Sequence, residues 1–233
     1  MQSSLWRALG NTYVVVEATD GGRLEPADAA ALARDADGVI EILASSAERV
    51  EIAIWNPDGS RAELSGNGTR IAAAWLAARS GAEGIEVVVG ERSVTTRILD
   101  DGVLEQDLGE VTVAPSETIS GLSVTPVSVG NPHAVVMGDP VTIVDIGPLL
   151  ETHARFPDRT NVQVARIDAP GRVTARVWER GVGETASSGT SAVAVAAATH
   201  GEGDVVVRFP GGDLRVRLAN GRAWLYGSAE RVS

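Results

Sequence analysis

The sequence of 233 residues contains no cysteine, and all 20 of its basic residues are arginine. Without a thiol, the chain can form no disulfide, thiolate zinc site, iron–sulfur cluster or cysteine nucleophile. Without lysine, it can form no Schiff base with pyridoxal phosphate, and it lacks the lysine of a Walker A loop. No His/Asp/Glu cluster has the spacing of a metal site, so we expect neither a metal nor a cofactor.

Positive charge and long apolar runs are also scarce. The chain has 31 acidic residues against 20 basic ones, which gives a net charge of −11 and disfavours nucleic acid as a partner. No apolar run reaches the roughly 18 residues of a membrane span, and the first residues lack the features of a signal peptide. We therefore expect a soluble cytoplasmic protein with no membrane partner.

What the sequence does contain is a long series of short β-strands. They are rich in β-branched residues and are flanked by Gly, Asp or Pro, which is typical of strands separated by turns. The expected strands are Thr12–Ala18, Val39–Leu43, Arg49–Trp55, Ile85–Val89, Ser93–Leu99, Val103–Leu108, Leu122–Val129, Ala134–Met137, Val162–Ile167, Val173–Glu179, Val205–Phe209, Leu214–Leu218 and Ala223–Tyr226.

Helical patterns are few. Pro26–Ala36 and Leu149–Phe156 are candidates for short helices. Two further segments, Gly66–Arg79 and Gly189–His200, are rich in alanine and almost wholly apolar. A helix that is apolar on all sides is buried, so we expect each of these two to lie in a core.

The two alanine-rich helices reveal an internal repeat. Ser65-Gly-Asn-Gly-Thr precedes the first and Ser188-Gly-Thr-Ser-Ala the second, at an offset of 188 − 65 = 123 residues. This predicts an α+β fold with two similar domains, each a strand-rich layer around one buried helix. We place the boundary in 113–121, so that 1–114 forms the N-terminal half and 115–221 the C-terminal half. The N-terminal half is expected to be completed by the last strand, at about 222–233.

Each buried helix begins with serine followed by glycine, which is an N-cap arrangement. A capping role alone is one interpretation of each serine. The other rests on the free N–H groups and positive dipole of a helix N-terminus. If the halves are related by pseudo-symmetry, two such N-termini would face a common cleft and hold the carboxylate of a small substrate.

Side-chain amides and charges lie in the neighbouring turns. Asn56, Asn131 and Asn161 lie in such turns, where asparagine is more often a turn residue than a ligand. Glu179 and Arg180 follow a strand and lead into the second helix. They are candidates for binding an amino group and a carboxylate, or for a surface ion pair.

At these residues the sequence resembles the diaminopimelate epimerase family of cofactor-independent amino-acid epimerases, over nearly the whole chain. Several motifs occur in the family's order, which makes the resemblance specific. They are Gly10-Asn11-Thr-Tyr13-Val-Val, Asn56-Pro-Asp-Gly-Ser60, Ser65-Gly66-Asn67-Gly68, Gly130-Asn131-Pro-His133, Arg159-Thr-Asn161-Val162, Glu179-Arg180-Gly-Val-Gly-Glu184-Thr185 and Ser188-Gly189-Thr190.

The resemblance implies two pseudo-symmetric domains, each a barrel-like, mostly antiparallel sheet around a central helix, with a small amino acid bound between them. It also implies a homodimer. The residues implied to bind the substrate's charged end are Asn11, Asn56, Asn131, Asn161, Glu179 and Arg180. Those implied to offer donors around its α-carboxylate are Gly66, Asn67, Gly189 and Thr190, with His133 and Glu184 in supporting roles.

The chain departs from the family at the two positions where the resemblance places proton transfer. In the family, two cysteines flank the α-carbon, one removing a proton and the other donating one. Here these positions are Ser65 and Ser188. We expect an isomerase that converts LL-diaminopimelate to the meso form, in lysine and peptidoglycan biosynthesis, with activity lowered because a hydroxyl is a weaker acid than a thiol.

Two alternatives stay open on the same fold. The site could run related racemase, isomerase or dehydratase chemistry, with Glu63, Glu184 or His133 as the base. The protein could instead bind an amino acid without turning it over.

Overall fold

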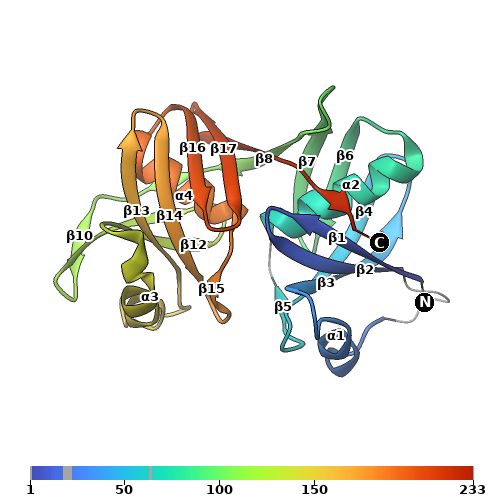
Figure 1. Cartoon of the computed structure of the whole chain (residues 1–233), viewed down its shortest axis with the longest axis horizontal. Helices are drawn as coiled ribbons and strands as arrows, with labels where there is room; N and C mark the ends of the chain where they lie inside the picture. The colour runs from blue at the N-terminus through green and yellow to red at the C-terminus, as the bar shows by residue number, and fades with distance from the viewer. Residues whose placement is uncertain (1, 18–22, 63–64, 233) are drawn as a thin grey trace. The chain divides into compact units, whose positions relative to one another are not determined.

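The computed structural model describes residues 2–17, 23–62 and 65–232. It divides into two compact units (Figure 1). The N-terminal unit comprises residues 1–107 together with 226–233, and the C-terminal unit comprises residues 108–225. The last residues of the chain therefore return to the first unit.

The N-terminal unit is a mixed sheet in which strands of distant sequence position are neighbours. Its pairing order is β19 (Glu230–Arg231), β1 (Gln2–Ala8), β2 (Asn11–Glu17), β3 (Gly38–Ser45), β4 (Arg49–Trp55), β6 (Gly84–Val89), β7 (Arg92–Ile98) and β8 (Leu104–Glu110). β8 continues past residue 107 into the C-terminal unit. The β2–β3 and β4–β6 pairs are parallel and the others antiparallel. The short β5 (Arg61–Ala62) pairs with the end of β4.

The C-terminal unit repeats this arrangement. β9 (Thr112–Val113) and β10 (Glu117–Ile119) both pair with β11 (Leu122–Ser128). The order then runs β12 (Pro132–Met137), β13 (Asn161–Ala169), β14 (Arg172–Glu179), β16 (Gly203–Phe209) and β17 (Gly212–Ala219). The parallel pairs are β12–β13 and β14–β16, and β15 (Gly183–Thr185) pairs with the end of β14. β18 (Arg222–Gly227) follows β17 in the sequence and continues past residue 225 into the N-terminal unit.

The register of the two sheets confirms the internal repeat. Val39 lies opposite Trp55 in the first unit, and Val162 lies opposite Trp178 in the second, so both partners are displaced by 123 residues. A register irregularity follows in both hairpins, between residues 42 and 44 and between residues 167 and 169. The similarity therefore extends from the helix starts to the details of strand pairing.

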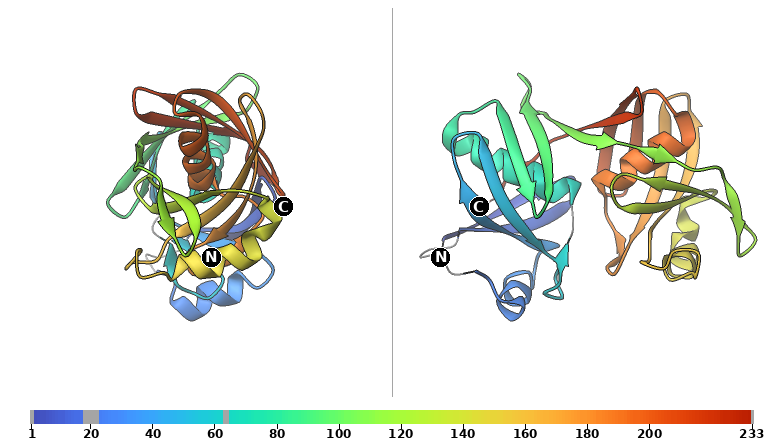
Figure 2. Two further views of the ribbon diagram at one scale, coloured as in Figure 1. Left: turned by 90° about the vertical axis from the view of Figure 1, so that its left-hand side faces the viewer. Right: turned by 180° about the vertical axis from the view of Figure 1, so that it is seen from behind.

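Each sheet surrounds one buried helix, which confirms the expected α+β, barrel-like fold. α2 (Gly66–Ser80) contacts β1, β2, β3, β4, β6, β7 and β19, and α4 (Gly189–His200) contacts β11, β12, β13, β14, β16 and β17 (Figures 1 and 2). The apolar residues of α2, such as Ile71 and Leu76, join one core with the strands around them. In the part of the chain that the structure describes, no helix has the length and apolarity needed to span a membrane.

Each of the two smaller helices connects a pair of parallel strands in the sequence, and the bounds of both helices differ from those expected. α1 (Pro26–Leu32) is shorter than the expected 26–36. The expected helix Leu149–Phe156 has the wrong bounds: α3 spans Ile143–Glu151, after a 3₁₀ turn at Pro140–Thr142. Burial of one face, at Ile143, Gly147 and Leu150, carries this helix through Pro148, although proline removes one backbone hydrogen bond.

The thirteen expected strands are all present, with ends that differ by a few residues; Ala18 lies outside the described residues. Six observed strands were not predicted from the sequence: β1 and the short strands β5, β9, β10, β15 and β19. β1 begins with the polar residues Gln2, Ser3 and Ser4, but it pairs with β2 along its whole length. Tertiary pairing thus overrides a weak local strand preference.

The contact between α3 and the sheet gives a first prediction. A Cβ added at Gly147 would lie 2.6 Å from Cγ of Trp178. Alanine is intrinsically better than glycine in a helix by about 1 kcal/mol, but overpacking costs about 1–3 kcal/mol. We therefore expect Gly147→Ala to lower the free energy of unfolding, measured by urea denaturation.

Gly84→Ala is the matched control, because a Cβ at Gly84 meets nothing within 4 Å. The control is expected to unfold like the unmodified protein. Equal midpoints for the two variants would show that Trp178 moves aside without cost.

Candidate active site

Ser65 caps the N-terminus of α2 and also contacts a phenol. Its Oγ accepts a hydrogen bond from the backbone N–H of Gly68 at 3.0 Å, and its backbone is extended, with φ −133° and ψ 120°. The Oη atom of Tyr13 on β2 lies 3.2 Å from the same Oγ. The serine therefore has both the expected capping role and a second polar neighbour.

Asn67 and Arg70 lie in the first turns of α2. Both side chains are buried, and Arg70 is wholly so. Arg70 donates from Nη2 to Oδ1 of Asn67 at 2.5 Å and from Nε to the carbonyl of Ser228 at 3.2 Å. Burial lowers the pKa of Arg70 to about 10, an effect opposed by its interaction with Tyr13. The guanidinium therefore stays charged at neutral pH.

Asn56 belongs to a closed turn that follows β4. Its backbone N–H donates to the carbonyl of Ser60, its Nδ2 donates to Ser60 Oγ at 2.9 Å, and its own carbonyl accepts from Gly59. Asp58 accepts both the backbone N–H and the hydroxyl of Ser60, which lowers the pKa of Asp58. Asn56 is thus a turn residue whose side chain fixes the loop. Asn11 lies buried at the start of β2.

Ser188 stands at the N-terminus of α4, as Ser65 does at that of α2, but it makes no side-chain capping bond. Its backbone is extended, with φ −146° and ψ 129°, and its carbonyl accepts the N–H of Ala192 at 3.0 Å. Ser188, Gly189 and Thr190 are all buried. The two helix starts therefore share their backbone form and differ in how the serine hydroxyl is bonded.

His133 is held in a buried network that links two strands to α4. Its Nε2 lies 3.0 Å from Oδ1 of Asn131, and Nε2 of Gln163 lies 3.0 Å from its Nδ1. Gln163 also donates to Ser191 Oγ in the first turn of α4 at 2.9 Å. Burial lowers the pKa of His133 to about 3. The imidazole is neutral with both nitrogens engaged, so it orients Asn131 and is poorly suited to act as a base.

The remaining polar candidates of the C-terminal unit gather where β13 begins and β14 ends. Asn161 accepts the backbone N–H of Arg180 at 3.0 Å and donates to the carbonyl of Pro132 at 3.0 Å. Glu179 accepts the Thr185 hydroxyl at 2.6 Å. The structure thus brings Asn161, Glu179 and Arg180 together.

Of the other two candidate bases, the structure describes Glu184 but not Glu63. Glu184 on β15 forms an ion pair with Arg176, with Oε1 2.5 Å from Nε. Glu63 lies outside the described residues.

Comparison with known proteins decides the family. The family model for diaminopimelate epimerase matches residues 5–114 and 125–232. The diaminopimelate epimerase of Desulforudis audaxviator is 36% identical, covering 100% of this chain and 97% of the relative. That of Xanthomonas axonopodis pv. citri is 37% identical over 89% of this chain and 85% of the relative.

This chain belongs to the diaminopimelate epimerase family. The expectation of an epimerase-like isomerase is confirmed at that level. Solved structures agree on the fold. A predicted epimerase from Pseudomonas aeruginosa matches with a TM-score of 0.76 at 18% identity, covering 99% of this chain and 96% of the other. A hydroxyproline epimerase from Agrobacterium vitis matches with a TM-score of 0.74 at 17% identity, covering 100% and 91%.

A buried glutamate that was not predicted from the sequence holds the loop after β14. Glu151, the last residue of α3, accepts hydrogen bonds from Nε1 of Trp178 at 2.7 Å, from the N–H of Gly181 at 2.7 Å and from Arg159. Burial raises the pKa of Glu151, but these bonds outweigh it and hold the pKa below its usual value. Glu151 thereby anchors the loop that carries Arg180. A glutamate at the end of a helix gives no sequence signal for this role.

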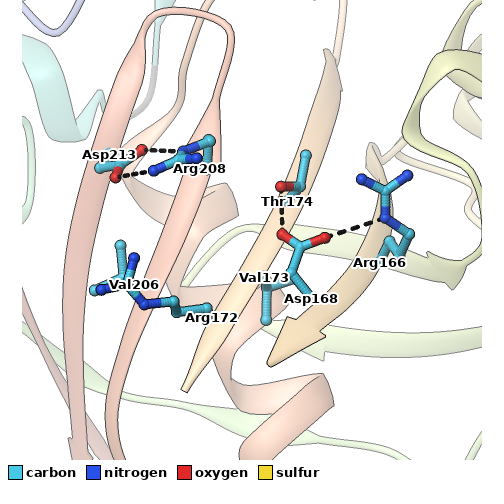
Figure 3. Close-up of a pocket in the computed structure, with 8 residues that line it drawn as sticks. All are labelled: Arg166, Asp168, Arg172, Val173, Thr174, Val206, Arg208 and Asp213. Atoms are coloured by element: carbon cyan, nitrogen blue, oxygen red, sulfur yellow. Dashed lines mark hydrogen bonds and ion pairs between the residues drawn. The ribbon is translucent and has the colours of Figure 1, made fainter. Parts of the chain in front are cut away.

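A hollow on the outer face of the C-terminal sheet contains none of the expected site residues. Figure 3 shows that several of its charged side chains are bonded to one another: Arg208 pairs with Asp213, and Asp168 accepts from Arg166 and Thr174. The residues that line it are Arg166, Asp168, Arg172, Val173, Thr174, Val206, Arg208 and Asp213. Across 2–17, 23–62 and 65–232, no three His, Asp or Glu side chains gather as metal ligands would.

The unequal bonding of the two serines predicts unequal stability effects. Ser65→Ala removes the hydroxyl that caps Gly68 and should reduce the free energy of unfolding by about 1 kcal/mol. Ser188→Ala removes no capping bond and should cost clearly less. Urea denaturation of the two variants side by side measures the difference. A larger loss for Ser188→Ala would contradict the assignment of the cap to Ser65.

The buried imidazole predicts a pH dependence of stability. The pKa of His133 falls from 6.5 to about 3 on folding, so between these values the unfolded chain binds the proton more readily. Its contribution is therefore fully present above pH 6.5 and is lost as the pH falls, by at most about 1.4 kcal/mol per unit.

The measurement compares unfolding free energies of the unmodified protein and His133→Gln from neutral pH downward. The stability advantage of the unmodified protein should shrink as the pH falls. His153→Gln, outside the buried network, is the matched histidine-to-glutamine control. A constant difference between the protein and His133→Gln would show that the imidazole takes up its proton at the same pH in the folded and unfolded states.

Proposed function

We propose that this protein inverts the α-carbon of LL-diaminopimelate to the meso form, with Ser65 and Ser188 in the two acid/base positions. The observation that carries the proposal is the pair of equivalent helix starts. Both α2 and α4 are buried, apolar helices that begin at a Ser-Gly step, 123 residues apart, in sheets of the same topology. Family membership supports the choice of substrate.

The substrate's α-carboxylate is assigned to the backbone donors at the helix starts. The first N–H groups of a helix have no partner within the helix, and the dipole favours an anion there. Gly66 and Asn67 supply these donors in one unit, and Gly189 and Thr190 in the other. Neither helix has an acidic residue in its first turn that would compete for the position.

The polar residues near β13 and β14 are assigned to the charged groups of the amino acid. Arg180 takes a carboxylate and Glu179 the ammonium group, because opposite charges recognise these groups most strongly. Asn161 acts one step away, since its amide is bonded to the backbones of Arg180 and Pro132. Asn11, Asn56 and Asn131 complete the polar surround by the family resemblance.

Serine at both positions sets an expectation for the rate. A thiol has a pKa of about 8.5 and can be brought near neutrality at a helix N-terminus, whereas an alcohol ionises far less readily. A base works best when its pKa lies near the working pH. The reaction should therefore be slow unless another group assists the serine.

The family resemblance carries the remaining proposals. We assign the chain to the cytoplasm as a homodimer acting on a small amino acid, in the biosynthesis of lysine and peptidoglycan. Its net charge of −11 supports neither nucleic acid nor an anionic membrane surface as partner.

Restoring the thiols tests the assignment of the two serines. The double variant Ser65→Cys, Ser188→Cys should raise exchange of the α-proton of diaminopimelate in deuterated water by about 10²-fold or more, because thiols are better matched to neutral pH. Nuclear magnetic resonance of the substrate measures the exchange. Ser80→Cys places a thiol at the other end of α2 and should give no gain. No gain in the double variant would refute the assignment.

The alternative base is tested in the unmodified protein. Under the proposal, Glu184→Gln leaves exchange within a few-fold, because Glu184 pairs with Arg176 and serves a supporting role. Loss of turnover with unchanged affinity would instead make Glu184 the base of a related reaction. Calorimetric binding of diaminopimelate without exchange in either the protein or its double cysteine variant would identify an amino-acid binder.

A further inference from the structure

The phenol of Tyr13 is fixed against Ser65 by the packing of the N-terminal sheet. Tyr13 is 7% exposed, and its ring lies over Gly38, its parallel partner on β3. A Cβ at Gly38 would come within 2.8 Å of Cε1 of the ring, so glycine makes the space that the ring occupies. Trp6, the partner of Tyr13 on β1, carries no charge. The resulting Oη–Oγ distance to Ser65 is 3.2 Å.

Arg70 brings a buried positive charge to the helix that Ser65 caps, without a carboxylate partner. Its two bonded nitrogens donate to neutral groups, the Asn67 amide and the Ser228 carbonyl, and its Nη1 is buried without a hydrogen-bond partner. Among the described residues, no Asp or Glu forms an ion pair with it. Its positive charge interacts favourably with Tyr13. A buried charge is costly unless it is paired, and the phenolate of Tyr13 is an anion that would pair with it.

The hydroxyl of Ser65 is bonded in a way that leaves its proton available to Tyr13. The Gly68 N–H occupies one lone pair of Oγ. Either oxygen can donate across the 3.2 Å contact with Tyr13. Ser65 can therefore give its proton to a phenolate and retain a lone pair for a proton from substrate. A hydroxyl activated by an adjacent base is the usual way in which serine becomes reactive.

We infer that Tyr13 accepts the proton of Ser65 and returns it, within the N-terminal unit. The buried guanidinium of Arg70 stabilises the phenolate form of Tyr13. The inference rests on the proposed function, since it assigns Ser65 an acid/base role. Tyr13 acts through Ser65 and is not assigned any contact with the substrate.

The step balances without a further reactant. The substrate Cα–H bond breaks, its electron pair stays on the α-carbon, and the proton forms a new O–H bond on Ser65. At the same time the original O–H bond of Ser65 breaks and that proton forms the O–H bond of Tyr13. Phenolate and substrate thus become phenol and carbanion. The reverse sequence delivers a proton from Tyr13 through Ser65 to the carbanion.

The C-terminal unit lacks this arrangement. His133 has the register position of Tyr13, because His133 pairs with Asn161 as Tyr13 pairs with Gly38. Its two ring nitrogens are occupied by Asn131 and Gln163. Ser188 makes no side-chain capping bond. The proton relay from Ser65 to Tyr13 is therefore assigned to the N-terminal unit alone.

A spectroscopic titration tests the pair without any need for turnover. The chain has two tyrosines, so Tyr226→Phe leaves Tyr13 as the only phenol. The phenolate absorbance of this variant should appear about one pH unit or more below the value of about 10 that is ordinary for tyrosine. Adding Arg70→Met should move the ionisation upward. An ordinary ionisation in the Tyr226→Phe protein would overturn the inference, even if the Arg70 variant does not fold.

Exchange kinetics test the role in proton transfer. Tyr13→Phe should slow α-proton exchange by about 10²-fold, flatten its pH profile where Tyr13 ionises, and leave the affinity for diaminopimelate within about twofold. Tyr226→Phe is the matched control and should exchange at the unmodified rate. Equal rates for both variants would overturn the inference. Absence of exchange in the unmodified protein would refute the proposed function, and the titration would still decide whether Arg70 and Tyr13 form the pair.

Discussion

The burial of one apolar helix inside each sheet is the constraint on which the rest of this structure depends. A helix surrounded by strands forms its own backbone hydrogen bonds along its interior, but its first N–H groups have no partner within the helix. These donors emerge with Ser65 in one unit and Ser188 in the other, at the same point of the same topology. The donors that could bind an anion are therefore a consequence of burying one helix in each sheet.

Within that shared frame, the two halves have diverged in chemistry. One has a phenol and a buried guanidinium at its helix start, and the other has a neutral imidazole tied to two amides. The backbone supplies nearly equal donors in both halves, whereas the side chains decide protonation. An epimerase needs one face to accept a proton while the other donates, and unequal surroundings are suited to two different protonation states.

The spacing of apolar residues and the Gly, Asp and Pro residues that flank them made the strands, the buried helices and both serines predictable. Each of these features depends on residues that are close in sequence. The bounds of α3 were not, since its buried face outweighs the local effect of Pro148. The same holds for Glu151, Gln163 and Arg70. Their roles come from partners that the fold brings near, such as Gly181, His133 and Ser228. Residue type and spacing carry no record of such contacts, so buried polar networks are the part of a site that sequence patterns reveal least.

When a hydroxyl replaces a thiol, the helix N-terminus alone no longer suffices to activate the group, and neighbouring side chains must do so. A helix N-terminus contributes about half a charge, which suffices to tune a thiol but falls short for an alcohol. A hydroxyl needs a neighbour that takes its proton, and that neighbour needs a cation to remain anionic in a buried site. Under the proposal, Tyr13 is that neighbour for Ser65 and Arg70 is its cation, whereas Ser188 makes no side-chain capping bond. The proposed relay therefore makes Ser65 the stronger base of the two serines, and it leaves Ser188 to return a proton to a strongly basic carbanion.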